Sequence, residues 1–112
     1  MSQYTPDAWV IVKISSKEHG SHYRVMAGWY GGFAGSDSWK MNSGIVGYTE
    51  DEYGYHFYGE SGSVYHCNRN IERFTGYMRV VFDSFVSDFR DEAKGSTLEH
   101  IDFAQFALDF KP

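Results

Sequence analysis

The chain has 112 residues, of which 42% are hydrophobic and 22% are charged. This length and composition predict one globular domain over residues 1–112 and argue against a disordered chain. Fifteen acidic residues against ten basic ones give a formal net charge of −5. The acidic balance argues against direct nucleic-acid binding, because contacts to phosphate dominate that affinity.

Aromatic residues make up 19% of the chain, whereas leucine occurs only at Leu98 and Leu108. Aromatic and β-branched side chains suit strands, so a β-rich core is expected. The single cysteine, Cys67, excludes an internal disulfide and indicates a reducing compartment. The sequence has no signal-peptide pattern and no apolar stretch of membrane-spanning length, so a cytoplasmic location without membrane contact is expected.

The first half of the chain is typical of antiparallel strands. Residues 8–14 form a nearly continuous β-branched run, which predicts a strand that is central or covered on both faces. Residues 23–29 alternate between apolar and other side chains and are expected to pair with that strand as a hairpin. After a Gly- and Ser-rich loop, residues 39–41 and 45–49 look extended, and Asn-Ser-Gly at 42–44 indicates a turn or bulge between them.

A second hairpin is predicted from residues 53–58 and 63–67. A three-residue loop with Gly62 in the left-handed conformation would pair Gly59 with Ser63. That register places His56 directly opposite His66 on one face. The other face then carries the better core, made of Tyr53, Tyr55, Phe57, Tyr65 and Cys67.

From Ile71 onward the apolar spacing becomes helical, with a stripe formed by Ile71, Phe74, Met78, Phe82, Phe85 and Phe89. Asn70 is the expected N-cap, although Gly76 would delay the regular helix to about Tyr77, and Gly95 is the expected C-cap position. If the stripe is buried against the sheet, Phe85→Ala should cost about 3–5 kcal/mol.

The segment 97–110 is open to two interpretations. Residues 96–99 fit a helical capping box, whereas the apolar alternation that follows favours a final strand, which we prefer. The predicted fold is therefore α+β: a twisted antiparallel sheet of five or six strands, with one long helix from the C-terminal half packed on one face.

Little in the sequence indicates catalysis. His56 and His66 would lie side by side, but a third metal ligand is missing on their face, so neither a metal site nor a cofactor is expected. Cys67 lies on the opposite face and is expected to be a small buried apolar residue. We assign no catalytic residue; an enzyme of unfamiliar type that uses His56 and His66 is the remaining catalytic alternative.

The segment 28–39 holds four aromatic residues among glycines and serines, a composition typical of binding loops. The alternative is that Trp29 and Trp39 end strands and pack in the core, while the glycines only make the turn. We expect Tyr30 and Phe33 to be the exposed pair, because they lie between glycines and away from the strand ends. The acidic turn at 50–52 is a second candidate contact surface. The predicted binding residues are Trp29, Tyr30, Phe33, Trp39, Glu50, Asp51 and Glu52.

The phrases Tyr-Arg-Val-Met-Ala-Gly-Trp-Tyr-Gly-Gly at 23–32 and Asp-Ser-Trp-Lys-Met-Asn-Ser-Gly-Ile at 37–45 give a family resemblance. Over residues 8–68 the chain resembles small uncharacterised accessory proteins of tailed bacteriophages. The resemblance implies a non-enzymatic protein in the bacterial host cytoplasm that binds and inhibits a host or defence protein. The alternative is a protein that binds or sequesters a nucleotide or sugar through the aromatic loop. A homo-oligomer is compatible with either function.

Overall fold

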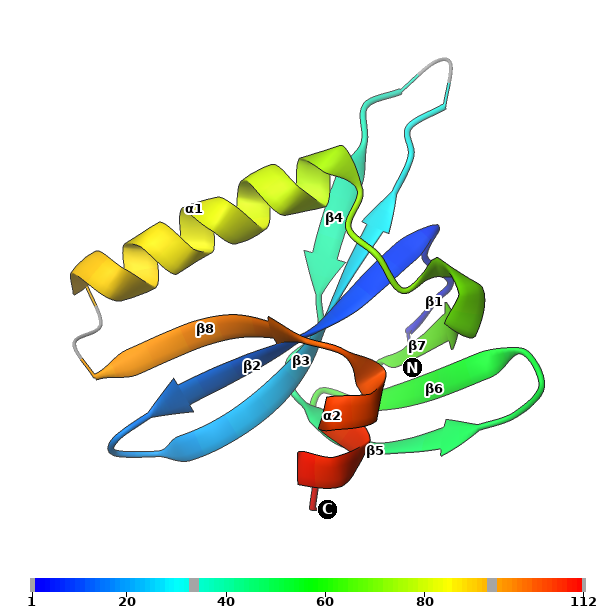
Figure 1. Ribbon diagram of the computed structural model, residues 1–112. Helices are drawn as coiled ribbons and strands as arrows, with labels where there is room; N and C mark the ends of the chain where they lie inside the picture. The colour runs from blue at the N-terminus through cyan, green and yellow to red at the C-terminus, as the bar shows by residue number, and fades with distance from the viewer. Residues whose placement is uncertain (1, 33–34, 93–94, 112) are drawn as a thin grey trace.

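The computed structural model describes residues 2–32, 35–92 and 95–111, which form two four-stranded sheets, two α-helices and one 3-10 turn (Figure 1). The strands are β1 (Gln3–Tyr4), β2 (Ala8–Ser16), β3 (Gly20–Trp29), β4 (Ser38–Met41), β5 (Ile45–Glu50), β6 (Gly54–Gly59), β7 (Val64–Asn68) and β8 (Ser96–Ile101). The 3-10 turn η1 spans Arg69–Ile71, and the helices are α1 (Gly76–Glu92) and α2 (Phe103–Asp109).

The predicted single sheet of five or six strands with one helix is wrong. One sheet has the order β4-β3-β2-β8 and the other the order β1-β7-β6-β5, in which the short β1 pairs with β7 in parallel. The physical reason lies in β2, whose side chains are fully buried on both faces from Ala8 to Val12. One helix covers one face only, so the second sheet is needed to cover the other.

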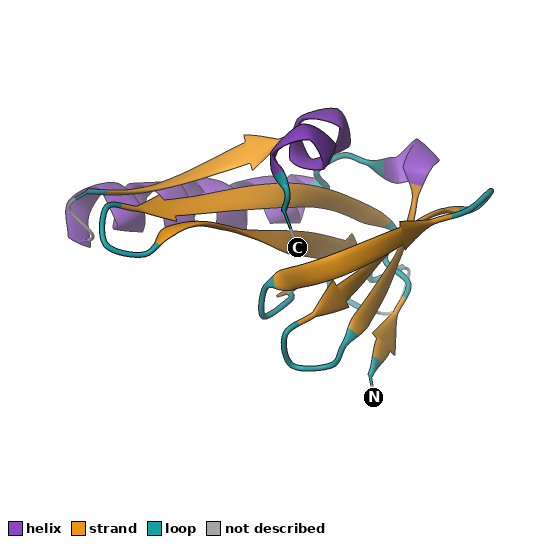
Figure 2. Ribbon diagram, turned by 90° about the horizontal axis from the view of Figure 1, so that it is seen from below, coloured by secondary structure: helices purple, strands orange, loops and turns teal. Residues whose placement is uncertain are grey.

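The molecule therefore has three layers, which Figures 1 and 2 show from two directions. Helix α1 lies across one face of β4-β3-β2-β8, where Val10, Val12 and Met26 meet Met78 and Phe82. The other face of that sheet packs on β1-β7-β6-β5. Helix α2 joins this second interface through Phe106, which is fully buried.

The interface between the two sheets consists largely of aromatic rings. Trp9 of β2 lies 5.6 Å from Phe57 of β6, measured between ring centroids, and Phe57 lies 5.8 Å from Phe106 of α2. Trp9 Nε1 also donates a hydrogen bond to the Asn68 carbonyl oxygen at 2.7 Å. This interface is the main core, and it fixes the second sheet and α2 relative to β2.

Asn42, in the Asn-Ser-Gly segment, lies where the chain leaves one sheet and enters the other. The backbone N–H of Asn42 donates to the Val25 carbonyl, and the Val25 N–H donates to Asn42 Oδ1 at 2.9 Å. These two bonds hold the end of β4 against β3 while the next residues lead into β5. Gly44 has a φ of +143°, which favours glycine at this bend. The predicted turn is thus the passage from one sheet to the other.

The two predicted hairpins are confirmed. Strands β2 and β3 pair antiparallel from Ala8–Gly28 to Ser16–Gly20. In the second hairpin, β6 and β7 pair His56 with His66, and Gly62 has a φ of +95°. Phe57, Tyr65 and Cys67 are buried on the expected core face of this hairpin, and Tyr55 is half-buried. The prediction is wrong for Tyr53, which precedes β6 and is exposed.

The helix prediction needs correction at the segment before α1. Asn70 does not cap the helix: Asn68 caps the preceding 3-10 turn, and Thr75 Oγ1 accepts the Met78 N–H at 3.0 Å at the start of α1. Ile71 therefore precedes the helix and packs on the aromatic core instead.

The last segment of the chain is part strand and part helix. Residues 96–101 form β8, which pairs with β2, so the predicted capping box does not start a helix there. Asp102 then caps α2 by accepting the Gln105 N–H at 2.8 Å. Phe103, Phe106 and Phe110 follow helical spacing, so the preferred strand over the whole of 97–110 is wrong.

Candidate functional site

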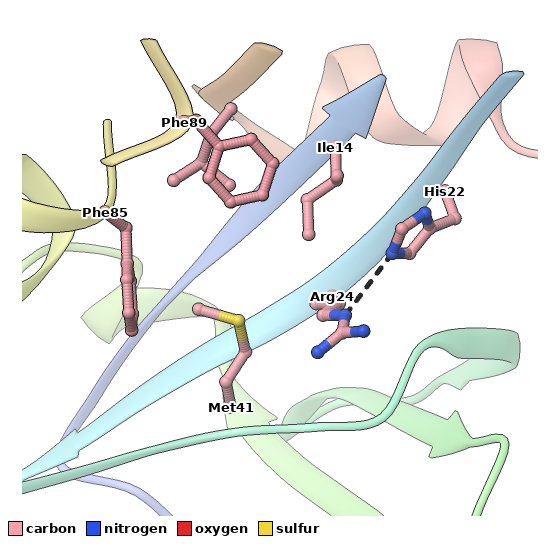
Figure 3. Close-up of a pocket in the computed structure, with 7 residues that line it drawn as sticks. Ile14, His22, Arg24, Met41, Phe85 and Phe89 are labelled. Atoms are coloured by element: carbon pink, nitrogen blue, oxygen red, sulfur yellow. Dashed lines mark hydrogen bonds between the residues drawn. The ribbon is translucent and has the colours of Figure 1, made fainter. Parts of the chain in front are cut away.

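An apolar pocket of about 270 Å³ lies between the second half of α1 and the sheet below it (Figure 3). Strands β2, β3, β4 and β8 and helix α1 all contribute side chains to it. The lining residues are Ile14, His22, Arg24, Met41, Phe85, Phe89 and Leu98. Five of these seven are apolar, which is typical of ligand pockets.

The pocket exists because α1 packs more tightly on the sheet at its start than toward its end. Near the start, Met78 is fully buried and Gly28 allows its close approach, since a Cβ at Gly28 would lie 2.3 Å from Met78 Sδ. Farther along α1, Phe85 and Phe89 are only half-buried. Their rings point from α1 toward Met41 and Ile14, as Figure 3 shows. The space between the two rings and the sheet is the pocket.

Two polar side chains of β3 form one end of this pocket. Arg24 and His22 lie on the same face of the strand, and Arg24 Nε–H donates to His22 Nε2 at 3.4 Å. Burial and then the Arg24 charge lower the pKa of His22 below its ordinary value, while Glu60 acts in the opposite direction. These effects favour the neutral imidazole that accepts from Arg24.

The aromatic loop does not form one continuous surface. Trp29 lies beside Tyr4 and donates through Nε1 to the Thr5 carbonyl at 3.1 Å. Trp39 lies on the opposite face of the sheet, because it pairs with Gly28 rather than with Trp29. Its ring meets Phe85 edge-on at 5.4 Å, so Trp39 supports one wall of the pocket.

Of the two aromatics expected to be exposed, Tyr30 has 51% of its surface accessible. Asp7 Oδ2 accepts the Tyr30 N–H at 2.9 Å, and Asp37 Oδ1 accepts the Gly31 N–H at 3.0 Å. These bonds fix the backbone beneath the ring. Phe33 lies outside the described residues.

Two of the three carboxylates in the acidic turn pair with side chains of the fold. Glu50 pairs with Arg69 at 3.2 Å, and Asp51 lies 2.8 Å from His56 Nε2. Asp51 Oδ1 also accepts the backbone N–H groups of residues 53 and 54. The hydrogen bond to His56 is the main reason why the pKa of Asp51 lies below its ordinary value. Glu52 is exposed, so less negative charge is free than the sequence indicates.

The two histidines form a direct pair. His56 Nδ1 and His66 Nδ1 are 2.7 Å apart, and the outer nitrogens contact Asp51 Oδ2 and Gln3 Oε1, each at 2.8 Å. Two nitrogens on one zinc ion would be separated by roughly 3.3 Å, given bonds of about 2.0–2.1 Å. Among the described residues, no group of three His, Cys, Asp or Glu side chains is arranged around a possible metal position.

Two further titratable side chains, those of Cys67 and Glu72, have structural roles in the fold. Cys67 is fully buried, and burial raises the pKa of its thiol, so this side chain behaves as the expected apolar residue. Glu72, which the sequence did not single out, accepts the Phe103 N–H at 2.8 Å and so holds the start of α2. Burial raises the pKa of Glu72 as well.

No family model, curated protein or solved structure matches the chain. In the described part of the chain, no helix has the length and apolar character needed to cross a membrane. The pocket under α1 combines a cavity, an apolar lining and polar groups at one end. It was missed from the sequence because Arg24 and His22 alternate with Tyr23 and Val25, a pattern typical of a solvent-facing strand surface.

Proposed function

We propose that this protein binds an apolar molecule in the pocket beneath α1. The observation that carries the proposal is the lining itself, in which Phe85, Phe89, Met41, Ile14 and Leu98 surround about 270 Å³ of space. Cavities of about 150 Å³ with such linings already bind benzene, so this pocket has room for a somewhat larger group. The half-buried phenylalanines would gain further burial from an occupant, which favours binding.

The direct test uses the neutral fluorescent probe N-phenyl-1-naphthylamine, whose emission increases in apolar surroundings. The wild-type protein should bind it saturably at one site per chain. Met41→Trp places a large ring in the pocket and should abolish this binding. The matched control is Val46→Trp, which adds the same ring to an exposed position of β5. Equal probe binding by all three proteins would contradict the proposal.

A second candidate function follows from the resemblance to phage accessory proteins: binding and inhibition of a host or defence protein in the bacterial cytoplasm. Tyr30 favours it, because an exposed ring on a fixed backbone loses little entropy when it binds a partner. Aromatic side chains of this kind tend to dominate interface energies.

Affinity capture from bacterial lysate tests this second function. A partner retained by the wild type should be lost from Tyr30→Ala and kept by Tyr77→Ala, which removes an exposed tyrosine from α1 instead. Both variants should keep the wild-type melting temperature within about 2 °C, because neither ring is part of the core. Equal capture by the two variants would exclude Tyr30 from the contact.

A further inference from the structure

The face of β3 that α1 covers changes from apolar to cationic along the strand. Met26, Arg24 and His22 occupy successive positions on this face, since side chains alternate along a strand. Met26 is fully buried beneath α1, Arg24 is half-buried and His22 is exposed. The cationic side chain thus lies where the apolar layer opens into the pocket.

Arg24 has no carboxylate partner among the described side chains. The salt bridges there join Lys13, His19, His56, Arg69 and Arg79 to acidic residues, and Arg24 takes part in none. Partial burial removes part of the hydration of the Arg24 guanidinium, and an anionic partner would compensate for that loss. The guanidinium is therefore an unmatched positive charge in the pocket wall.

The geometry of the Arg24 guanidinium determines which chemical group of a ligand would pair with it. Its Nε–H already donates to His22, which leaves the four N–H groups of the two terminal nitrogens. That planar fork fits the two oxygens of a carboxylate. Phe85, Met41 and Phe89 line the same cavity and offer an apolar surface to the rest of such a molecule.

Resting on the proposed function, we infer that the ligand is a small organic monocarboxylate. Its carboxylate pairs with Arg24, and its apolar body, of about six to ten carbon atoms by volume, lies against Met41, Phe85 and Phe89. A free small molecule matches the size of this pocket, which has a volume of about 270 Å³ and one cation at its end.

The test compares ligands of equal chain length as competitors for bound N-phenyl-1-naphthylamine: octanoate, 1-octanol and octylamine. In the wild type, octanoate should displace the probe at a concentration at least about tenfold below that of 1-octanol, since a charged hydrogen-bonded pair is worth that factor or more. Octylamine should be the weakest competitor, because its ammonium group lies next to Arg24.

Arg24→Gln should remove the preference for octanoate over 1-octanol and leave binding of the neutral probe intact. Arg73→Gln is the matched control: it removes the same charge from an exposed position outside the pocket and should keep the preference. Should Arg24→Gln fail to fold, NMR of the wild-type Arg24 Nε–H resonance decides the question. Octanoate should shift that resonance, and 1-octanol should leave it nearly unchanged.

The outcomes separate this inference from the proposed function. Probe binding with equal displacement by octanoate and 1-octanol would overturn the carboxylate inference and leave apolar binding in place. Failure of both the neutral probe and octanoate to bind would overturn both. A preference for octanoate that persists in Arg24→Gln would also overturn the role of Arg24.

Discussion

The two faces of β2 are packed by different kinds of side chain and to different densities. Trp9 and Ile11 face an interface of aromatic rings from both sheets and α2, and these rings contact one another at centroid distances down to 3.7 Å. Val10 and Val12 face α1, whose Phe85 and Phe89 are half-buried beside a cavity. We therefore expect the aromatic interface to contribute more to the free energy of unfolding than the helix side, where space remains for a ligand.

The largest effect is expected in the aromatic interface. Phe57→Ala removes a fully buried ring that contacts Trp9, Tyr48 and Phe106. Its free energy of unfolding should fall by about 3–5 kcal/mol, measured by chemical denaturation. The neighbouring Tyr58→Ala, on the opposite face of β6, should lose less than about 1 kcal/mol. Similar losses in the two variants would mean that the aromatic interface is not the stabilising one.

A smaller loss is expected on the helix side. The sequence led us to expect about 3–5 kcal/mol for Phe85→Ala on the condition that the ring is buried, but the ring is half-buried and borders the pocket. Less apolar surface returns to water, so about 1–2 kcal/mol is expected. Denaturation of Phe85→Ala and Phe57→Ala under the same conditions measures the contrast. A loss for Phe85→Ala as large as that for Phe57→Ala would remove the difference between the two faces.

The smallest effect concerns the outer surface of the second sheet. Burial, and then the neighbouring His56, lower the pKa of His66 below its ordinary value of 6.5. The unfolded chain therefore binds a proton at a higher pH than the folded protein does. The corresponding stability is present above pH 6.5 and is lost as the pH falls below that value. Unfolding free energies measured between pH 7.5 and 5 should show this slope, and His66→Gln should reduce it. An unchanged slope in the variant would exclude His66 as its source.

Local features of the fold could be predicted because their causes are local. The β6–β7 hairpin follows from alternating side chains and a glycine in the left-handed conformation, and its register matches the prediction at His56 and His66. The apolar stripe of α1 from Met78 to Phe89 follows from helical spacing in the same way.

The division into two sheets could not be predicted, because it depends on contacts between distant residues. Asn42 makes its two hydrogen bonds to Val25, 17 residues away, whereas the local Asn-Ser-Gly pattern indicates only a turn. The end of the chain is a different case. The sequence contains the N-cap Asp102 and the helical spacing of Phe103, Phe106 and Phe110, but the apolar alternation of the same segment favours a strand equally well.

The candidate site was hidden for a related reason. Arg24 and His22 indicate a pocket only once α1 is known to cover their face of β3. The aromatic loop attracted attention by composition, but its two tryptophans end on opposite faces of the sheet. Of the predicted binding residues that the structure describes, Trp39 contacts Phe85, which lines the pocket.

The row of contacts from Asp51 through His56 and His66 to Gln3 also has a donor direction. Because the Asp51 carboxylate only accepts, His56 Nε2 donates to it, and one further proton lies between the two Nδ1 atoms. When His66 is neutral, as burial of its imidazole favours, its Nδ1–H donates to His56 Nδ1 and its Nε2 accepts from the side-chain amide of Gln3. The row then runs in one direction, from the Gln3 amide on β1 to the Asp51 carboxylate. The two histidines thus connect the edge strand β1 to the acidic turn.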